Sequence, residues 1–224
     1  MPLSHPPIVA RMLNKVPEVT LAFWVIKIMA TTVGETGADY LAVHVGLGTA
    51  ATGGIVAGLL VAALLVQLRS RRYVPWLYWL TVVLVSVVGT QITDALTDGL
   101  EVSLYVSTAV FAAALAATFA VWYASERTLS IHTIVTGRRE LFYWAAILFT
   151  FALGTAAGDL ATEALGLGFQ IGVLVFGVLI AASDLVTTGD GDDESAAGFP
   201  PIFGGVACWA QSVKAEQAKT RIEP

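Results

Sequence analysis

Three aspartates stand at the same place in three copies of one pattern, which makes them the first candidates for chemistry. In each copy an aromatic residue precedes a tryptophan, a glycine follows ten residues after the tryptophan, and an aspartate follows five after that. The copies are Phe23-Trp24…Gly34…Asp39, Tyr78-Trp79…Gly89…Asp94 and Tyr143-Trp144…Gly154…Asp159. Each copy covers an apolar stretch long enough to cross a bilayer, where an acidic side chain is costly and usually functional.

Each aspartate has a second acid four residues away, which is one helical turn. The pairs are Glu35 with Asp39, Asp94 with Asp98, and Asp159 with Glu163. Residues four apart face the same side of a helix, so each copy offers two neighbouring carboxylates. Such carboxylates repel each other in a low dielectric unless they take up protons or share a cation. Hydroxyl oxygens lie next to them in the sequence, at Thr36, Thr90 and Thr155.

Oxygen-rich sites of this kind favour hard divalent cations such as Mn²⁺, Mg²⁺ or Ca²⁺. The predicted ligands are Glu35, Asp39, Asp94 and Asp159, with Asp98, Glu163, Thr36, Thr90, Thr155 and Lys27 in supporting roles. A second interpretation stays open, in which the acids cap helical turns or bond neighbouring helices. The same choice applies to Gly34, Gly89 and Gly154, which indicate either close helix packing or a local helix break that frees carbonyl oxygens.

Lys27 is the other costly side chain, because it lies about eight positions into the first apolar stretch. It would either extend along the helix to reach the cytoplasmic surface or pair with another helix, for example through Asp184. If buried, it would serve as a fixed or titrating charge in an ion-coupled pathway.

The composition is that of a polytopic membrane protein. Apolar residues make up 56% of the 224 residues and charged residues only 13%. Six runs approach or reach the roughly 20 residues that a bilayer core requires. The predicted spans are Val19–Leu41, Thr52–Leu68, Trp76–Ala95, Val102–Tyr123, Leu141–Leu160 and Phe169–Val186. The fold class is therefore all-α, with a lipid bilayer as the first partner and no sign of nucleic-acid binding.

The basic residues predict the orientation. Eleven of the 12 Lys and Arg residues fall at the termini or in the second and fourth connections, and Lys27 is the exception. By the positive-inside rule both termini are cytoplasmic. The acids of the repeats then lie at the outer side.

Each copy continues into a second apolar run, so the chain is predicted to contain three parallel helical-hairpin repeats, at about 17–70, 72–125 and 139–187. They form a transmembrane domain over 1–187, followed by a cytoplasmic tail over 188–224 whose composition predicts disorder in its larger part. Between the second and third repeats the linker Ser125–Glu140 would form either a loop or a short interfacial helix. In the second span Gly54 and Gly58 would allow close helix approach or be ordinary membrane glycines.

Three segments resemble a family of bacterial inner-membrane proteins labelled only as uncharacterised membrane-anchored proteins. They are Val16–Trp24, Gly34–Asp39 and the run from Ile131 to Leu160. The resemblance implies a bacterial inner membrane and no particular activity. It also implies a fourth hairpin, and this chain departs from that pattern after Asp184.

The pattern predicts a transporter or channel for a cation, either a divalent metal or one coupled to protons. The alternative is a scaffold or sensor that transports nothing. No Walker loop, HExxH motif or Ser/His/Asp grouping is present, so an enzyme is not expected. An open bundle of three hairpins would gain buried surface by self-association into a homo-oligomer.

Overall fold

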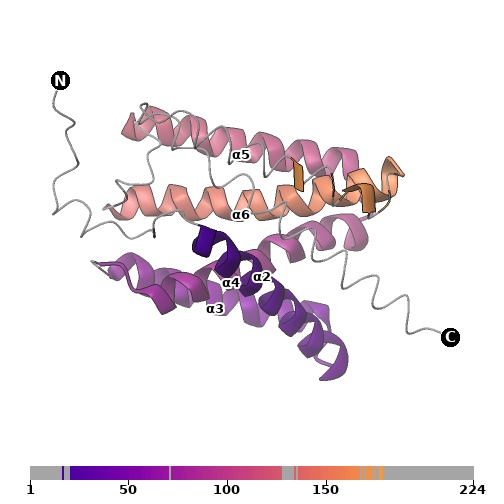
Figure 1. The fold of residues 1–224 in the computed structure, drawn as a ribbon, viewed down its shortest axis with the longest axis horizontal. Coiled ribbons are helices and arrows are strands. Elements are labelled where there is room, and N and C mark those ends of the chain that lie inside the picture. Colours follow the sequence, from indigo (N-terminus) through magenta and orange to yellow (C-terminus); the bar gives the residue numbers. More distant parts are fainter. Residues whose placement is uncertain are drawn as a thin grey trace.

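The computed structural model describes residues 17, 21–70, 72–127, 134, 136–166, 168, 170–172, 174, 177 and 178. Every regular element in this part of the chain is a helix (Figure 1). The five long helices are α2 (Leu21–Asp39), α3 (Thr49–Arg69), α4 (Pro75–Asp94), α5 (Leu104–Glu126) and α6 (Gly137–Asp159). The prediction of an all-α fold is confirmed.

Four helices are long and apolar enough to cross a membrane, as judged by length and composition. They are α3, α4 with the turn that follows it, α5, and α6 with the turn that follows it. Helix α2 has 19 residues and occupies the equivalent place in the first repeat, but Lys27 and Glu35 make it more polar. The sixth predicted span lies largely outside the described residues, and the few described between 168 and 178 are helical.

The repeats interlock rather than standing as separate hairpins. Helix α3 packs against α4, which opens the next repeat, and α5 packs in the same way against α6. Contacts within one repeat are sparser, because α2 meets α3 only over a short stretch. In Figure 1, α5 and α6 run side by side while α2 crosses obliquely. The first helices α2, α4 and α6 form a continuous series, with α4 in the middle.

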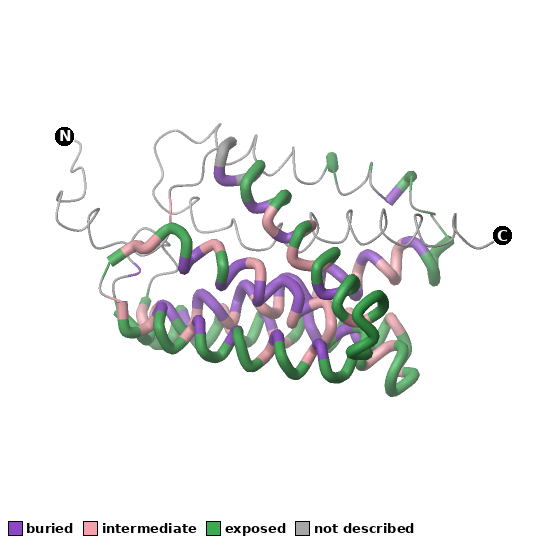
Figure 2. Tube along the Cα trace, turned by 90° about the horizontal axis from the view of Figure 1, so that it is seen from below, coloured by how far each residue is buried: buried purple, intermediate pink, exposed green. Residues whose placement is uncertain are grey.

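The return helices α3 and α5 bury equivalent positions. Thr52, Val56, Leu60 and Gln67 are buried on α3, and the residues 55 places later on α5 are buried too: Ser107, Phe111, Leu115 and Trp122. Their spacing of three to four residues, or multiples of it, is that of one helical face. The remaining faces are mostly exposed, as Figure 2 shows along the outer sides of the helices. They carry many large apolar side chains, which suits contact with lipid.

Glycines set the distance between the first helices. A Cβ built on Gly34 of α2 would lie 2.5 Å from Val83 Cγ1 of α4. One built on Gly89 of α4 would lie 2.7 Å from Phe151 Cβ of α6 and 3.2 Å from the backbone of Leu148 and Ala152. Both glycines lie inside regular α-helix, so close packing is their role and a helix break is not. Gly54 and Gly58, by contrast, have nothing within 4 Å of such a Cβ.

The turn after each first helix has the same form in all three repeats. Five residues in π-helical geometry follow the aspartate, at η1 (Tyr40–His44), η2 (Ala95–Gly99) and η4 (Leu160–Ala164). Seven residues after each aspartate the backbone has a positive φ, at Gly46, Glu101 and Gly166. Glycine adopts this conformation without strain, whereas Glu101 in the second repeat does not.

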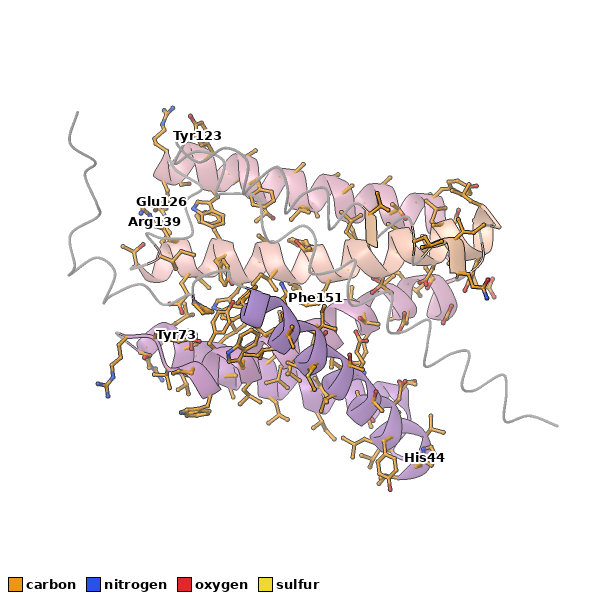
Figure 3. All side chains as sticks on the ribbon, in the orientation of Figure 1. His44, Tyr73, Tyr123, Glu126, Arg139 and Phe151 are labelled. Carbon is orange, nitrogen blue, oxygen red and sulfur yellow. The ribbon has the colours of Figure 1, made fainter. Side chains whose placement is uncertain are left out.

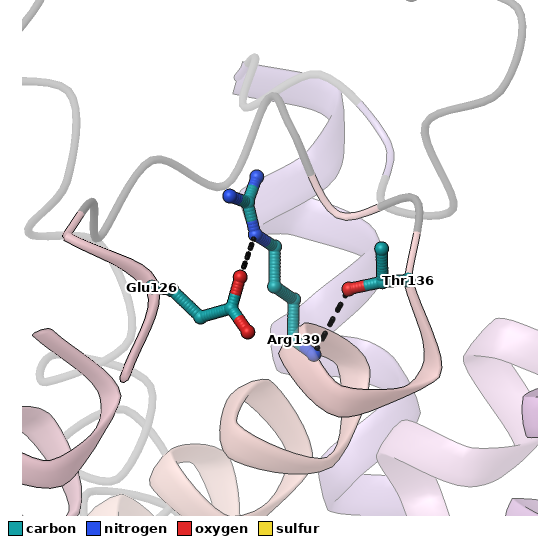
Figure 4. Close-up of polar contacts among 3 residues, drawn as sticks. All are labelled: Glu126, Thr136 and Arg139. Carbon is teal, nitrogen blue, oxygen red and sulfur yellow. Dashed lines mark hydrogen bonds and ion pairs between the residues drawn. The ribbon is translucent and has the colours of Figure 1, made fainter. Parts of the chain in front are cut away.

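Local contacts define the other helix boundaries. Pro75 begins α4, where its missing N–H costs nothing. The Thr136 hydroxyl caps α6 by accepting a hydrogen bond from the Arg139 N–H at 3.4 Å (Figure 4). The Arg139 guanidinium also meets the Glu126 carboxylate at 2.7 Å, which ties the start of α6 to the end of α5. The predictions for most of the linker 125–140, for Asp184 and for the tail 188–224 fall outside the described residues.

The glycine contacts make a direct prediction about stability. Replacing Gly89 by Ala should destabilise the protein by about 1–3 kcal/mol, because the new methyl group meets backbone atoms that cannot move aside. Thermal unfolding of the purified protein in detergent measures the effect. Gly58→Ala is the control, since its methyl group enters open space in a helix and should leave the melting temperature unchanged or raise it. Equal melting temperatures for the two variants would contradict the packing role.

Candidate functional site

The helix bundle has two chemically different ends. The acidic end, where the first helices finish, carries the acids of the repeats together with Glu101. The basic end carries the arginines that follow α3 and α5 and open α6. Figure 3 shows this separation, with Arg139 and Glu126 at one end of the molecule and His44 at the other.

Three side chains from equivalent repeat positions meet between the first helices. They are Glu35 on α2, Thr90 on α4 and Thr155 on α6, each directly after the glycine of its repeat. The Thr90 hydroxyl donates to Glu35 Oε1 at 3.1 Å and lies 3.3 Å from the Thr155 hydroxyl. Glu35 is half-buried, and Thr155 is buried. The group places one carboxylate and two hydroxyls within a single polar cluster in the interior of the bundle.

A second group of acids lies about one turn further toward the acidic end. The half-buried Asp159 carboxylate is close enough to Asp94, Glu163 and Asp98 to feel repulsion from all three, most strongly from Asp94. The second and third repeats therefore bring their predicted acids together. The low dielectric near the bundle interior makes this repulsion larger than in water and favours a cation at this end.

The first repeat contributes differently. Asp39 is exposed and is not among the groups that repel Asp159. Thr36, grouped with Thr90 and Thr155 in the sequence, is also exposed. The residue of the first repeat that is equivalent to Thr90 and Thr155 is Glu35. His44 stacks on Tyr40 with ring centroids 5.0 Å apart and takes no part in the cluster.

Metal-ligand geometry is incomplete in the described part of the chain. No group of three or more His, Cys, Asp or Glu side chains there lies close enough together to hold a metal ion. The four predicted ligands therefore do not form one cage. A divalent cation near Glu35 would take further oxygens from the Thr90 and Thr155 hydroxyls and from water.

None of the three repeat aspartates makes a side-chain hydrogen bond that caps the π-helical turn after it. This observation counts against the interpretation in which those carboxylates serve as caps. These five-residue turns lie at the ends of α2, α4 and α6, where the chain leaves each helix. The same turn therefore directly follows each of the three repeat aspartates.

Lys27 is buried between the helices, with 5% of its surface exposed. Its ammonium lies 5.9 Å from the centroid of the Phe23 ring on α2 and 5.5 Å from that of Phe151 on α6. Both distances suit cation–π attraction. The side chain does not extend to the surface, so Lys27 is an interior charge.

Aromatic side chains from the three first helices fill the interior toward the basic end. We name Phe23, Tyr78, Trp79, Tyr143 and Trp144 the aromatic layer. The buried Tyr78 and Tyr143 hydroxyls are 2.6 Å apart, and ring centroids within the layer lie 5.4 Å apart for Phe23 with Trp79 and 5.5 Å for Tyr78 with Trp144. The layer separates the Glu35 cluster from the basic end.

Tyr73 extends this packing into the loop before α4. Its ring meets Tyr78 edge-on, with centroids 5.8 Å apart. Burial raises the pKa of the Tyr73 hydroxyl, and a hydrogen bond with Trp79 opposes that rise with a smaller effect. The hydroxyl therefore stays neutral at physiological pH.

The sequence interpretation missed two features of this site. It paired the threonines with one another instead of aligning them with Glu35, although all three positions directly follow the repeat glycine. It also gave the aromatic residues of the repeats no role in the interior, whereas Tyr78, Tyr143 and Trp144 are buried. Strict alignment of the repeats would have found the first feature. The second depends on how the helices pack.

The cluster predicts a stability effect at Thr90. Replacing Thr90 by Val keeps the shape but removes the hydroxyl shared by Glu35 and Thr155, so the protein should lose about 1–2 kcal/mol of stability, the upper range for polar contacts between membrane helices. Thermal unfolding in detergent measures the loss. Thr97→Val is the matched control, because the Thr97 hydroxyl bonds only to the Thr93 carbonyl of its own helix among the described contacts. A loss in the control equal to that in Thr90→Val would show that the cluster holds nothing together.

Comparison with known proteins agrees with the repeat structure. The family model described as "Repeat of Unknown Function (DUF347)" matches three times, over residues 22–73, 77–128 and 142–188. The searches of curated proteins and of solved structures gave no match. The three matches together cover more than half of the chain, and the protein therefore belongs to the DUF347 repeat family.

Proposed function

We propose that this chain is a transporter or channel for a small cation in a bacterial inner membrane, with both termini and the basic end in the cytoplasm. The cation is a divalent metal or one whose movement is coupled to protons. The observation that carries the proposal is the cluster of Glu35, Thr90 and Thr155, in which equivalent residues of all three repeats meet inside the bundle.

The chemistry of the path supports a cation. Asp94, Asp98, Asp159 and Glu163 attract positive charge at the acidic end, where no Lys or Arg opposes them among the described residues. An ion drawn there meets the Glu35 carboxylate about one turn deeper, with hydroxyl oxygens beside it. Carboxylate and hydroxyl oxygens replace part of the water that a hard cation loses on entry.

A scaffold that transports nothing would account for the Glu35–Thr90 bond between helices but not for the mutually repelling acids around Asp159. It would use the repeat acids as caps or as bonds between helices. The three aspartates make no cap bonds to the turns that follow them, and Asp159 faces other acids. Mutually repelling carboxylates lower stability unless protons or a cation compensate their charge, which suits binding better than structure.

Transport measurements test the proposal. Replacing Asp39, Asp94 and Asp159 together by Asn, or Glu35 alone by Gln, should abolish flux of Mn²⁺, Mg²⁺ or Ca²⁺ into proteoliposomes, because each change removes charge that attracts or binds the ion. Glu101→Gln is the control: it removes an exposed acid from the same end and should retain most of the flux. Wild-type flux from both the triple variant and Glu35→Gln would refute the proposal.

Binding can be measured separately from flux. The melting temperature of the wild-type protein should rise with the transported cation, since a ligand that binds only the folded state stabilises it by about 2.7 kcal/mol at a hundred times its Kd. A screen of Mn²⁺, Mg²⁺, Ca²⁺ and Zn²⁺ together with a pH series identifies the ion. Glu35→Gln should lose the rise. A rise that survives in Glu35→Gln would move the binding site elsewhere.

A further inference from the structure

Lys27 breaks the repeat pattern at a position where the other repeats are apolar. The equivalent residues are Val82 on α4 and Ile147 on α6, and both are buried in the core. A buried ammonium is far more costly than either side chain. The substitution falls in the same repeat that carries Glu35 where the others have threonine. The first repeat thus carries a charge at two positions where the other repeats have none, and both lie on α2.

The two charges lie along one buried side of α2. Thr31 stands between them and is also buried, with its hydroxyl donating to the Lys27 carbonyl at 3.0 Å. Glu35 is eight residues beyond Lys27, a rise of about 12 Å. The Lys27 ammonium lies near two rings, 5.9 Å from the centroid of Phe23, which belongs to the aromatic layer, and 5.5 Å from that of Phe151 on α6.

A cation leaving Glu35 for the basic end must therefore pass a positive charge. Like charges repel strongly at this depth because the protein interior screens them less than water does. An ammonium can remove that repulsion by giving up one proton, whereas a guanidinium cannot. Lys27 thus places a dischargeable cation on the buried side of α2, between Glu35 and the aromatic layer.

We propose that Lys27 couples the movement of the cation to the movement of protons. This proposal rests on the proposed function. As a cation bound at Glu35 moves toward the basic end, one N–H bond of the ammonium breaks and the proton passes to water on the acidic side. After the cation leaves, the free electron pair of the nitrogen takes a proton from water at the basic end. One proton thus moves in the direction opposite to the cation, and the reverse sequence runs the exchange backward.

Other titratable groups on the neighbouring helices have different places. Helix α2 itself carries Glu35 and Asp39, and α3 carries Arg69 at its basic end. The groups on the two helices nearest the ammonium are Tyr78 and Asp94 on α4, and Arg138, Arg139, Glu140, Tyr143 and Asp159 on α6. The aspartates lie at the acidic end and the arginines at the basic end. Lys27 is the one among these described groups that is a cation at the centre of the path.

Two substitutions at Lys27 should have opposite effects in proteoliposomes loaded with a pH gradient and offered the cation that stabilises the wild-type protein. Lys27→Arg keeps a charge that cannot be discharged, so flux should fall by at least about tenfold, which one unit of opposing charge readily produces. Lys27→Met removes the charge. The cation should then equilibrate across the membrane but no longer accumulate when a pH gradient is applied in either direction.

The controls separate this role from a structural one. Met at position 27 restores the apolar character of the other repeats, so the variant should stay monodisperse in detergent and unfold no earlier than the wild type. Arg72→Met removes an exposed charge at the basic end and should keep gradient-driven accumulation.

The outcomes distinguish the two proposals. Wild-type flux with full accumulation in Lys27→Met, or an unchanged rate in Lys27→Arg, would overturn the coupling role and leave the transporter standing. No cation flux from the wild type under any gradient would overturn both.

Discussion

The close approach of the first helices is the constraint on which the site depends. Gly89 lets α4 approach the backbone of α6, and Gly34 lets α2 approach the Val83 side chain of α4. The next residue on each helix is then held at hydrogen-bonding distance, which is why Thr90 reaches both Glu35 and Thr155. A larger residue at the glycine would separate the helices and with them the polar cluster. Packing and chemistry therefore occupy adjacent positions of the same repeat.

The duplicated helices give the bundle its architecture, and the positions at which the repeats differ in residue type carry its interior charges. Three identical units would have put the same residue type in all three repeats at each depth of the interior. At the depth of Glu35 the other two repeats have threonine, and at the depth of Lys27 they have an aliphatic residue. The first repeat carries both charged exceptions. A negative and a positive side chain at different depths make the interior electrically unequal along the helices, which no symmetric arrangement of these repeats can do.

Much of the fold could be read from the sequence because membrane spans and repeats leave strong patterns. Long apolar runs predict the helices, and the spacing of Trp, Gly and Asp predicts the duplication. Packing partners were not predictable in this way, since α3 touches the next repeat more than its own. The π-helical turns were missed because α- and π-geometry differ by one residue per hydrogen bond and carry no distinct composition. The sequence groups Asp39 with Asp94 and Asp159, although Asp94 and not Asp39 is among the groups that repel Asp159.

The interlocking of the repeats also bears on how the bundle moves. Each return helix is attached by its loop to one first helix and by its packing to the next, so α3 and α5 tie the three first helices together on the outside. Inside, the Tyr78–Tyr143 hydroxyl contact and the aromatic layer close the basic end, whereas the acidic end presents exposed carboxylates. If the proposed transporter opens toward the basic end, α4 and α6 must part at the aromatic layer, and the glycine contact nearer the acidic end would act as the pivot. The polar cluster directly beside that contact would then move least. A binding site at such a pivot would keep its geometry while access to it alternates, which suits the proposed transporter better than a permanently open channel.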